Sequence, residues 1–165
     1  MKIVIIGLGL IGGSIAKTLA SSQDHEILAF DSDQKSLKNA LDNQSIQGLL
    51  HTLDDLGNTE YEDSVVIIAT PPSAADEILK SLDFLFNSSV TITDTTSTKS
   101  SLNKTLQEFN FPKNFIFSHP VAGSHLSGEK NSVADLFNGK STILSYHDSV
   151  ASQHVDRVTN LWNAL

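Results

Sequence analysis

The feature that most constrains this chain is a set of glycines placed directly after a short apolar run at the N-terminus. Ile3–Ile6 has the composition of a buried strand, and it leads into Gly7–Gly12, which has the pattern G-x-G-x-x-G. Apolar residues then recur at helical spacing at Ile11, Ile15 and Leu19. A strand, a glycine-rich turn and a helix in this order predict the first βα unit of a dinucleotide-binding fold.

Each glycine of the turn has a separate physical reason. Gly7 permits a tight turn, Gly9 has no Cβ and lets a pyrophosphate approach the backbone, and Gly12 lets the helix pack close to the strand. The free N–H groups and the positive dipole end of the helix then face the phosphates. The candidate phosphate-binding residues are therefore Gly7, Gly9, Leu10, Ile11 and Gly12.

The charge balance fits this mode of binding. The chain has 11 basic and 19 acidic residues, a formal net charge of −8, which disfavours nucleic acid and anionic membranes as partners. A phosphate must therefore be held by local backbone donors rather than by the overall field. Cysteine is absent, which excludes disulfides and thiolate chemistry, and no apolar run approaches a membrane span, so the cytoplasm is the expected location.

Asp31 follows the second apolar run, Ile27–Phe30, about 20 residues after the glycine turn. A carboxylate at this place accepts hydrogen bonds from the adenosine ribose and repels the additional phosphate of NADP. Its neighbours, Ser32 and Asp33, include no arginine that could receive that phosphate. The pattern therefore favours NAD over NADP. The alternative is that the glycines only form a turn and that Asp31 caps the next helix.

Apolar runs alternate with helical patterns along the rest of the chain, which predicts βαβ units. The expected fold is α/β: a doubly wound, mostly parallel sheet with helices on both faces (Rossmann fold), in a single domain over residues 1–165. The expected strands are Ile3–Ile6, Ile27–Phe30, Val65–Ala69, Val90–Thr93, Phe115–Phe117 and Thr142–Leu144.

The last 17 residues, 149–165, have the pattern of an amphipathic helix. Its apolar side chains need a partner surface. Two interpretations stay open: the helix packs on the sheet, or it leads into a second domain.

Ligands of doubly wound sheets bind beyond the carboxyl ends of the strands, where three later loops are expected. In Ala69–Pro72, Thr70 and Pro71 are candidates to line the nicotinamide, although a plain strand-to-helix turn explains the prolines equally well. The loop Asp94–Lys99 brings hydroxyls and one ammonium to the edge of the cleft. Its alternative is a helix cap with Ser97 at or near the N-cap, and both roles can hold together.

The third loop, Ser118–Gly128, contains His119 between a strand end and a proline. A histidine beside a nicotinamide can orient or deprotonate a hydroxyl while hydride leaves the same carbon. A structural or solvated histidine is the alternative. The remaining histidines show no metal-ligand spacing with carboxylates, so no metal is expected.

Together these loops resemble the prephenate/arogenate dehydrogenase family of tyrosine biosynthesis. The resemblance covers essentially the whole chain, and its specific part is the His-Pro-x-Ala-Gly segment. The matching residues are Gly7–Ser14, then Asp94 with Ser97 and Lys99, then His119–Gly123 with Ser127 and Gly128.

The resemblance implies an oxidative decarboxylation. Hydride passes from the ring carbon that bears the 4-hydroxyl to the nicotinamide, the ring carboxylate leaves as CO₂, and the ring becomes aromatic. His119 would hydrogen-bond and polarise the 4-hydroxyl, and Ser97 would help to fix that hydroxyl and the histidine. Prephenate and arogenate are both open as the substrate.

Two departures from the family pattern bear on this expectation. Many members carry an acidic residue where this chain has His125, so properties tied to that acid do not transfer. The family also has a C-terminal helical domain that binds the substrate carboxylates and forms a homodimer, and the 165 residues do not include it. Arg157, the one arginine, is a poor candidate to replace its cations. The chain is therefore expected to bind NAD and to catalyse little by itself.

Two other functions remain as alternatives at this stage. Dehydrogenases of the β-hydroxyacid or imine-reducing type have a similar fold, and Pro120–Gly123 faintly resembles their Pro-Val-Ser-Gly-Gly segment. His119 before the proline favours the first function. The second alternative is a non-catalytic dinucleotide-binding module.

Overall fold

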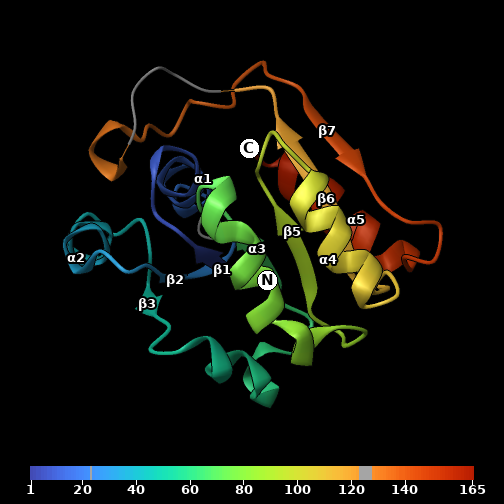
Figure 1. The fold of residues 1–165 in the computed structure, drawn as a ribbon. Coiled ribbons are helices and arrows are strands. Elements are labelled where there is room, and N and C mark those ends of the chain that lie inside the picture. Colours follow the sequence, from blue (N-terminus) through green and yellow to red (C-terminus); the bar gives the residue numbers. More distant parts are fainter. Residues whose placement is uncertain (23, 123–127) are drawn as a thin grey trace.

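The computed structural model of the chain describes residues 1–22, 24–122 and 128–165. Within these ranges seven strands form one sheet in the order β3-β2-β1-β4-β5-β6-β7 (Figure 1). Every neighbouring pair is parallel except β6 and β7. The strands are β1 (Lys2–Ile6), β2 (Glu26–Phe30), β3 (Gly48–Leu49), β4 (Val65–Ile68), β5 (Thr91–Asp94), β6 (Phe115–Pro120) and β7 (Thr142–Ser145).

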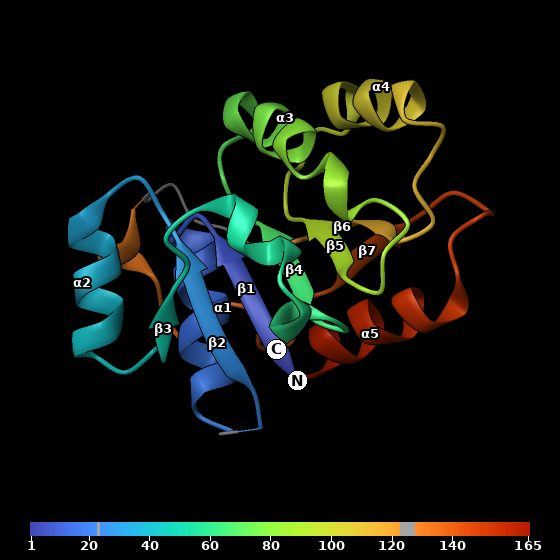
Figure 2. The ribbon, with the colours of Figure 1, turned by 90° about the horizontal axis from the view of Figure 1, so that it is seen from below.

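The helices lie in two layers, one on each face of the sheet (Figure 2). Those that cover one face are α3 (Pro72–Ser81) and α4 (Ser100–Glu108), while the other face is covered by α1 (Leu10–Ala20), α2 (Gln34–Asp42) and α5 (Ser152–Asn163). Short 3-10 turns occur at Leu53–Gly57, Thr59–Tyr61, Asp83–Leu85 and Glu129–Asn131.

The alternation of side chains along the central strands divides the core into two halves. In β1, Val4 and Ile6 pack with α3 and α4, whereas Ile3 and Ile5 pack with α1 and α5. Because successive side chains of a strand point to opposite faces, a strand covered on both faces must be apolar throughout. This requirement explains the unbroken apolar runs that predicted the strands.

The predicted doubly wound sheet is confirmed, with two differences in detail. The strand β3 was not predicted, because its two residues contain a glycine and form no apolar run. The last strand, β7, runs antiparallel to β6. An apolar run alone carries no information about the direction of its partner strand, so this difference was not visible in the sequence.

Helix α5 packs on the sheet, which is the first of the two interpretations of the C-terminal pattern. It begins at Ser152 rather than at residue 149, and it buries Val158 and Leu161. Trp162 donates its Nε1–H to the hydroxyl of Ser118 at 3.0 Å, which joins the helix to β6. Among the described residues, every helix is too short or too polar to cross a lipid bilayer.

The order of the strands fixes where a ligand can enter. The chain leaves β1 toward β2 on one side of it, and it returns to build β4 on the other side. The loops after β1 and β4 therefore diverge to opposite faces and leave a crevice at the carboxyl edge of the sheet. The 3-10 turn Glu129–Asn131 packs beside α1, and the chain runs from there to β7 at the far edge of the sheet (Figure 1).

One buried titratable group in the core makes stability depend on pH. His154 is 3% exposed, and its Nδ1 lies 2.7 Å from the hydroxyl of Thr91. Burial lowers the pKa of His154, the nearby Arg157 lowers it further, and Asp63 opposes them. The unfolded chain therefore binds the proton more readily than the folded one, so the free energy of unfolding falls as the pH drops below about 6.5, the ordinary histidine pKa.

Urea unfolding between pH 5 and 8 measures this dependence. We expect the free energy of unfolding to decrease toward acid pH, and the decrease to be smaller in a His154→Asn variant. The exposed His51→Asn variant controls for the loss of a histidine as such. An unchanged pH slope in His154→Asn would contradict the assignment.

Candidate dinucleotide-binding and catalytic site

Two adjoining pockets occupy the crevice at the carboxyl edge of the sheet. One has a volume of about 300 Å³ and reaches from Gly7 to Asp31, and the other, of about 400 Å³, extends to Ser97 and His119. They share four lining residues, which are Gly9, Ala69, Thr70 and Pro71. The structure therefore brings nearly all of the residues singled out in the sequence onto the walls of one continuous trough.

The glycine turn fits tightly against the loop that follows β4. Gly7 has φ +98°, a conformation that favours glycine, and a Cβ there would lie 2.9 Å from the carbonyl oxygen of Ala69. Gly12 does not line the trough. A Cβ at Gly12 would lie 1.9 Å from the carbonyl oxygen of Gly7, so only glycine lets α1 lie this close to the end of β1.

Gly9 has the opposite environment. It is the N-cap of α1, it carries no capping side chain, and a Cβ built on it meets no atom within 4 Å. The space beside Gly9 is therefore open to the trough, and Leu10 and Ile11, in the first turn of α1, line the same pocket. Free N–H groups at a helix N-terminus next to an open surface form an anion-binding arrangement.

Asp31 is held in a fixed orientation at the far end of the trough. Its Oδ2 accepts the N–H of Leu8 at 2.6 Å, and its Oδ1 accepts the N–H of Asp33 at 2.8 Å. The interpretation of Asp31 as a helix cap is wrong, because the N-cap of α2 is Asp33, whose carboxylate accepts the N–H of Lys35. Asp31 instead ties the glycine turn to the end of β2 and faces the pocket.

Both interpretations of the proline loop agree with the structure. Pro71 is the N-cap of α3 and Pro72 is its first residue, as expected of a strand-to-helix turn. The same turn lines both pockets. The hydroxyl of Thr70 is buried there and makes no hydrogen bond within the described part of the chain.

The loop after β5 differs from expectation in two respects. Helix α4 begins at Ser100 with Lys99 at the N-cap, so Ser97 does not cap the helix; it is exposed on the pocket wall. The Lys99 ammonium does not lie free at the cleft edge, because it donates to the Asp94 carboxylate at 2.6 Å and to the Ser118 carbonyl at 2.7 Å. Burial lowers the pKa of Lys99, and the charge of Asp94 opposes this shift.

His119 lies on β6, across the pocket from the glycine turn. Its side chain is half-buried, and its Nδ1 is buried without a hydrogen-bond partner among the described residues. Ser97 and His119 line the same pocket, together with Pro120, Ala122 and Gly128. The predicted residues Gly123, His125 and Ser127 lie outside the described residues.

One set of contacts was not predicted from the sequence. The hydroxyl of Ser14 accepts the N–H of Val133, and Lys17 donates to the carbonyl of Ser132. A Cβ at Gly13 would lie 2.8 Å from the Ser132 hydroxyl. The residues after the glycine turn thus hold the segment that returns from the His119 loop. Gly13 and Ser14 belong to the segment that resembles the family, but nothing in the sequence indicated that their partners lie more than 100 residues away.

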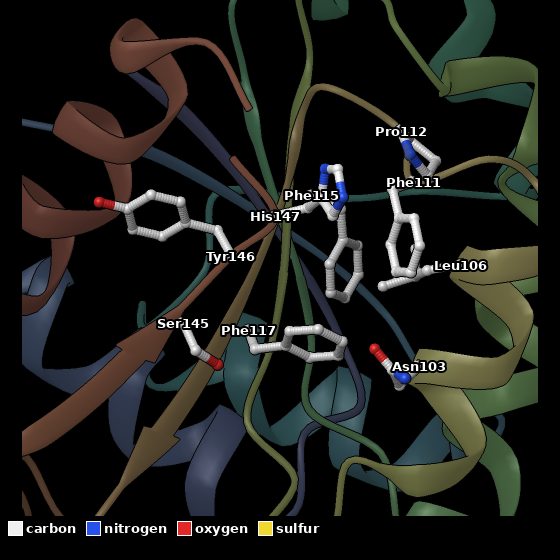
Figure 3. Close-up of a pocket in the computed structure, with 9 residues that line it drawn as sticks. All are labelled: Asn103, Leu106, Phe111, Pro112, Phe115, Phe117, Ser145, Tyr146 and His147. Carbon is white, nitrogen blue, oxygen red and sulfur yellow. The ribbon is translucent and has the colours of Figure 1, made fainter. Parts of the chain in front are cut away.

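A third cavity, of about 320 Å³, lies elsewhere in the molecule and shares no lining residue with the other two (Figure 3). Aromatic rings of Phe111, Phe115, Phe117 and His147 gather around it, and Phe111 stacks on His147 with ring centroids 4.4 Å apart. No residue singled out as a candidate lies on its walls. Arg157 is also remote from the trough, because it bonds to Ser89, Thr91 and Asp63.

A model of the family described as prephenate dehydrogenase, nucleotide-binding domain, matches residues 15–165. The chain belongs to this family. The matched range begins after the glycine turn, so the match does not depend on the motif that is shared among many dehydrogenases. The expected family is thereby confirmed.

Known relatives agree with the family model. Over 148 residues the chain is 35% identical to a prephenate dehydrogenase of Lactococcus lactis, a match that covers 87% of this chain and 40% of the relative. It is 31% identical to a cyclohexadienyl dehydrogenase of Zymomonas mobilis, covering 99% of this chain and 55% of the relative. The chain spans about half the length of these curated relatives.

A solved structure extends the likeness to three dimensions. The prephenate dehydrogenase of Aquifex aeolicus, in complex with hydroxyphenyl propionate and NAD⁺, superposes with a TM-score of 0.85 at 26% identity. The match covers 99% of this chain and 57% of that chain. The trough described above therefore belongs to a nucleotide-binding domain of this family.

The contrast between the glycines can be tested by stability measurements. Alanine usually stabilises a helix relative to glycine, but Gly12→Ala should lower the free energy of unfolding by about 1–3 kcal/mol because the methyl group overlaps the Gly7 carbonyl. Gly9→Ala is the matched control, and we expect it to lower the free energy of unfolding by no more than about 1 kcal/mol, the cost of alanine at an N-cap, because its methyl group meets no atom. Urea unfolding measures both. Equal losses of stability in the two variants would contradict the inference that α1 packs against the Gly7 carbonyl at Gly12.

Proposed function

We propose that this chain binds NAD along the trough and acts as the nucleotide-binding domain of a prephenate or arogenate dehydrogenase. The observation that carries the proposal is the position of Ser97 and His119 on the wall of the pocket that adjoins the glycine turn. A hydroxyl and an imidazole beside a dinucleotide site are the groups that oxidation of an alcohol requires. The Aquifex aeolicus relative, bound to NAD⁺ and a hydroxyphenyl compound, supports this proposal.

The trough has features that suit a dinucleotide. The open space beside Gly9 accommodates a pyrophosphate at the N-terminus of α1, where no side chain intrudes. Asp31 lies at one end to accept the ribose hydroxyls, and the unpaired hydroxyl of Thr70 lies between the two pockets. Backbone donors supply this binding, so a chain with a net charge of −8 can still bind an anion.

The geometry at Asp31 supports a preference for NAD over NADP. Hydrogen bonds from Leu8 and Asp33 hold the carboxylate in place, so it cannot easily turn away from a ligand. The described residues that line this pocket include no lysine or arginine. An additional phosphate on the ribose would therefore meet a fixed like charge without a compensating cation.

The reaction we propose follows from what each side chain can do. Bound NAD supplies the hydride acceptor. The imidazole of His119 accepts the proton of the substrate 4-hydroxyl as the C–O bond becomes a carbonyl, and Ser97 donates or accepts a hydrogen bond that holds this hydroxyl in place. Loss of the ring carboxylate as CO₂ completes the aromatisation.

The substrate carboxylates need a cation that the described trough does not supply. Lys99 is bonded to Asp94 and Ser118, and Arg157 is bonded far from the pocket. We infer that residues 1–165 form one domain, and that carboxylate binding and homodimer formation belong to the part of the family's proteins outside this domain. The alternative function is a non-catalytic dinucleotide-binding module. Measurements of turnover distinguish it from a dehydrogenase domain.

The cofactor preference gives the first test. Isothermal titration should show that the chain binds NAD at least about tenfold more tightly than NADP, because like charges would meet at Asp31. Asp31→Ser should narrow this ratio, whereas Asp33→Ser, two residues away and outside the pocket lining, should keep it. Gly9→Ala should bind neither cofactor measurably. Tighter binding of NADP by the unaltered chain would exclude the role given to Asp31.

The catalytic role gives the second test. In the longest natural reading frame that contains these residues, His119→Ala should reduce turnover by roughly 10²–10⁴-fold, as expected for the loss of an acid–base group. NADH absorbance with prephenate and with arogenate measures the rate and identifies the substrate. His147→Ala, on the other cavity, is the control and should turn over normally. Near-normal turnover of His119→Ala would remove this residue from the mechanism.

A further inference from the structure

The ion pair between the buried Asp94 and the partly buried Lys99 has no role in the chemistry described so far. Asp94 is fully buried, and its Oδ2 lies 2.6 Å from the ammonium of Lys99. The contacts already described direct two of the three N–H donors of Lys99 at Asp94 and Ser118, and Lys99 is not among the residues that line the trough. A buried charge pair is costly to desolvate, so its contacts require a reason.

The pair lies where main-chain pairing between β5 and β6 has ended. The register of the two strands stops at Thr93 and Ile116, and the N–H of Thr96 bonds to the Asp94 carboxylate instead of to β6. Two residues after Ile116 on β6, Ser118 still has an N–H and a carbonyl directed toward β5. Asp94 accepts that N–H through Oδ1 at 3.3 Å, and Lys99 donates to that carbonyl at 2.7 Å. Two side chains thus replace the missing backbone partner.

The same carboxylate also holds the other side of the pocket. Asp94 Oδ2 accepts the N–H of Thr96 at 2.9 Å and the hydroxyl of Thr96 at 2.5 Å. Thr96 directly precedes Ser97, and Ser118 directly precedes His119. One carboxylate therefore fixes the residue before each of the two candidate catalytic side chains.

Further side-chain contacts fix the position of Ser118. Its hydroxyl bonds to Thr93 at 2.7 Å and accepts the Nε1–H of Trp162. The ammonium of Lys99 also lies 5.5 Å from the ring centroid of Phe117, which forms a wall of the aromatic cavity (Figure 3). The Thr93 hydroxyl, Trp162 and Phe117 act on the side of Ser118, whereas Asp94 bonds to the residue before Ser97 and to the residue before His119.

We propose that Asp94 and Lys99 are positioning residues that set the distance between Ser97 and His119, and that the Lys99 ammonium does not bind substrate or cofactor. The proposal depends on the proposed function only for the roles of Ser97 and His119. The two side chains continue the pairing of β5 with β6 beyond the end of the backbone register, close in sequence to residues that line the pocket. This continuation explains why a lysine next to a dinucleotide site faces the protein instead of the ligand.

The test uses NMR of the 165-residue chain and therefore needs no turnover. The variants are Lys99→Met, Lys99→Arg and the double variant Asp94→Asn/Lys99→Met. The double variant is included because Lys99→Met alone leaves a buried carboxylate without a cation. The readouts are the hydrogen-exchange rate of the Ser118 amide, the ring resonances of His119 and the affinity for NAD. Arg157→Met, which removes another partly buried cation with a carboxylate and a carbonyl partner, is the matched control.

We expect the Ser118 amide to exchange about tenfold faster or more in the Lys99→Met and double variants, since a local hydrogen bond is weakened. The His119 ring resonances should shift in the same variants and return toward their original positions in Lys99→Arg. Arg157→Met should leave both readouts unchanged, and affinity for NAD should stay within about threefold in the double variant.

Three results would overturn the proposal. The first is unchanged Ser118 exchange and His119 resonances in the folded double variant. The second is an equal change in Arg157→Met, which would indicate general loosening. The third is a large loss of NAD affinity with the two NMR readouts unchanged, which would make Lys99 a ligand-binding group. Failure of the His119→Ala turnover test would remove the catalytic role of His119 but would leave these NMR results to decide the positioning role.

Discussion

The close approach of α1 to the end of β1 is the constraint on which the rest of this structure depends. A Cβ at Gly12 would lie 1.9 Å from the carbonyl oxygen of Gly7, so the helix can begin here only without a side chain. Gly7 is pressed against the backbone after β4 in the same way. This packing places the open N-terminus of α1 at the point where the strand order reverses, and the two pockets meet there. An anion site thus arises from backbone geometry in an acidic protein.

The polar contacts around the trough are directed mainly at backbone groups. Asp31 holds the glycine turn through Leu8, and Asp94 with Lys99 holds the strand that carries His119. Ser14 and Lys17 hold the segment that returns from the His119 loop. These four charged side chains therefore hold backbone segments around the trough, and of the four only Asp31 also lines a pocket wall.

Much of the fold could be predicted because burial on both faces forces strands to be apolar throughout. Six apolar runs marked six of the strands, and the helical spacing marked the helices between them. The two-residue β3 could not be found, since a strand that short has no pattern of its own. The sequence also left open whether Ser97 caps the helix that follows it, because a serine near the start of a helix is a common cap; in the structure Lys99 occupies the N-cap of α4.

The sequence by itself determined the class of fold, the glycine turn with Asp31 at its far end, and the residues that identify the prephenate dehydrogenase family. These depend on local backbone requirements or on short patterns, which one segment of chain contains in full. Only the tertiary structure decided that Lys99 faces Asp94 and Ser118, that Asp33 rather than Asp31 caps α2, and that Ser14 binds Val133. Each of these outcomes depends on which distant or competing partner lies within hydrogen-bond distance after the layers pack. The residue types permit several partners, and the packing of α1, β5 and β6 selects one.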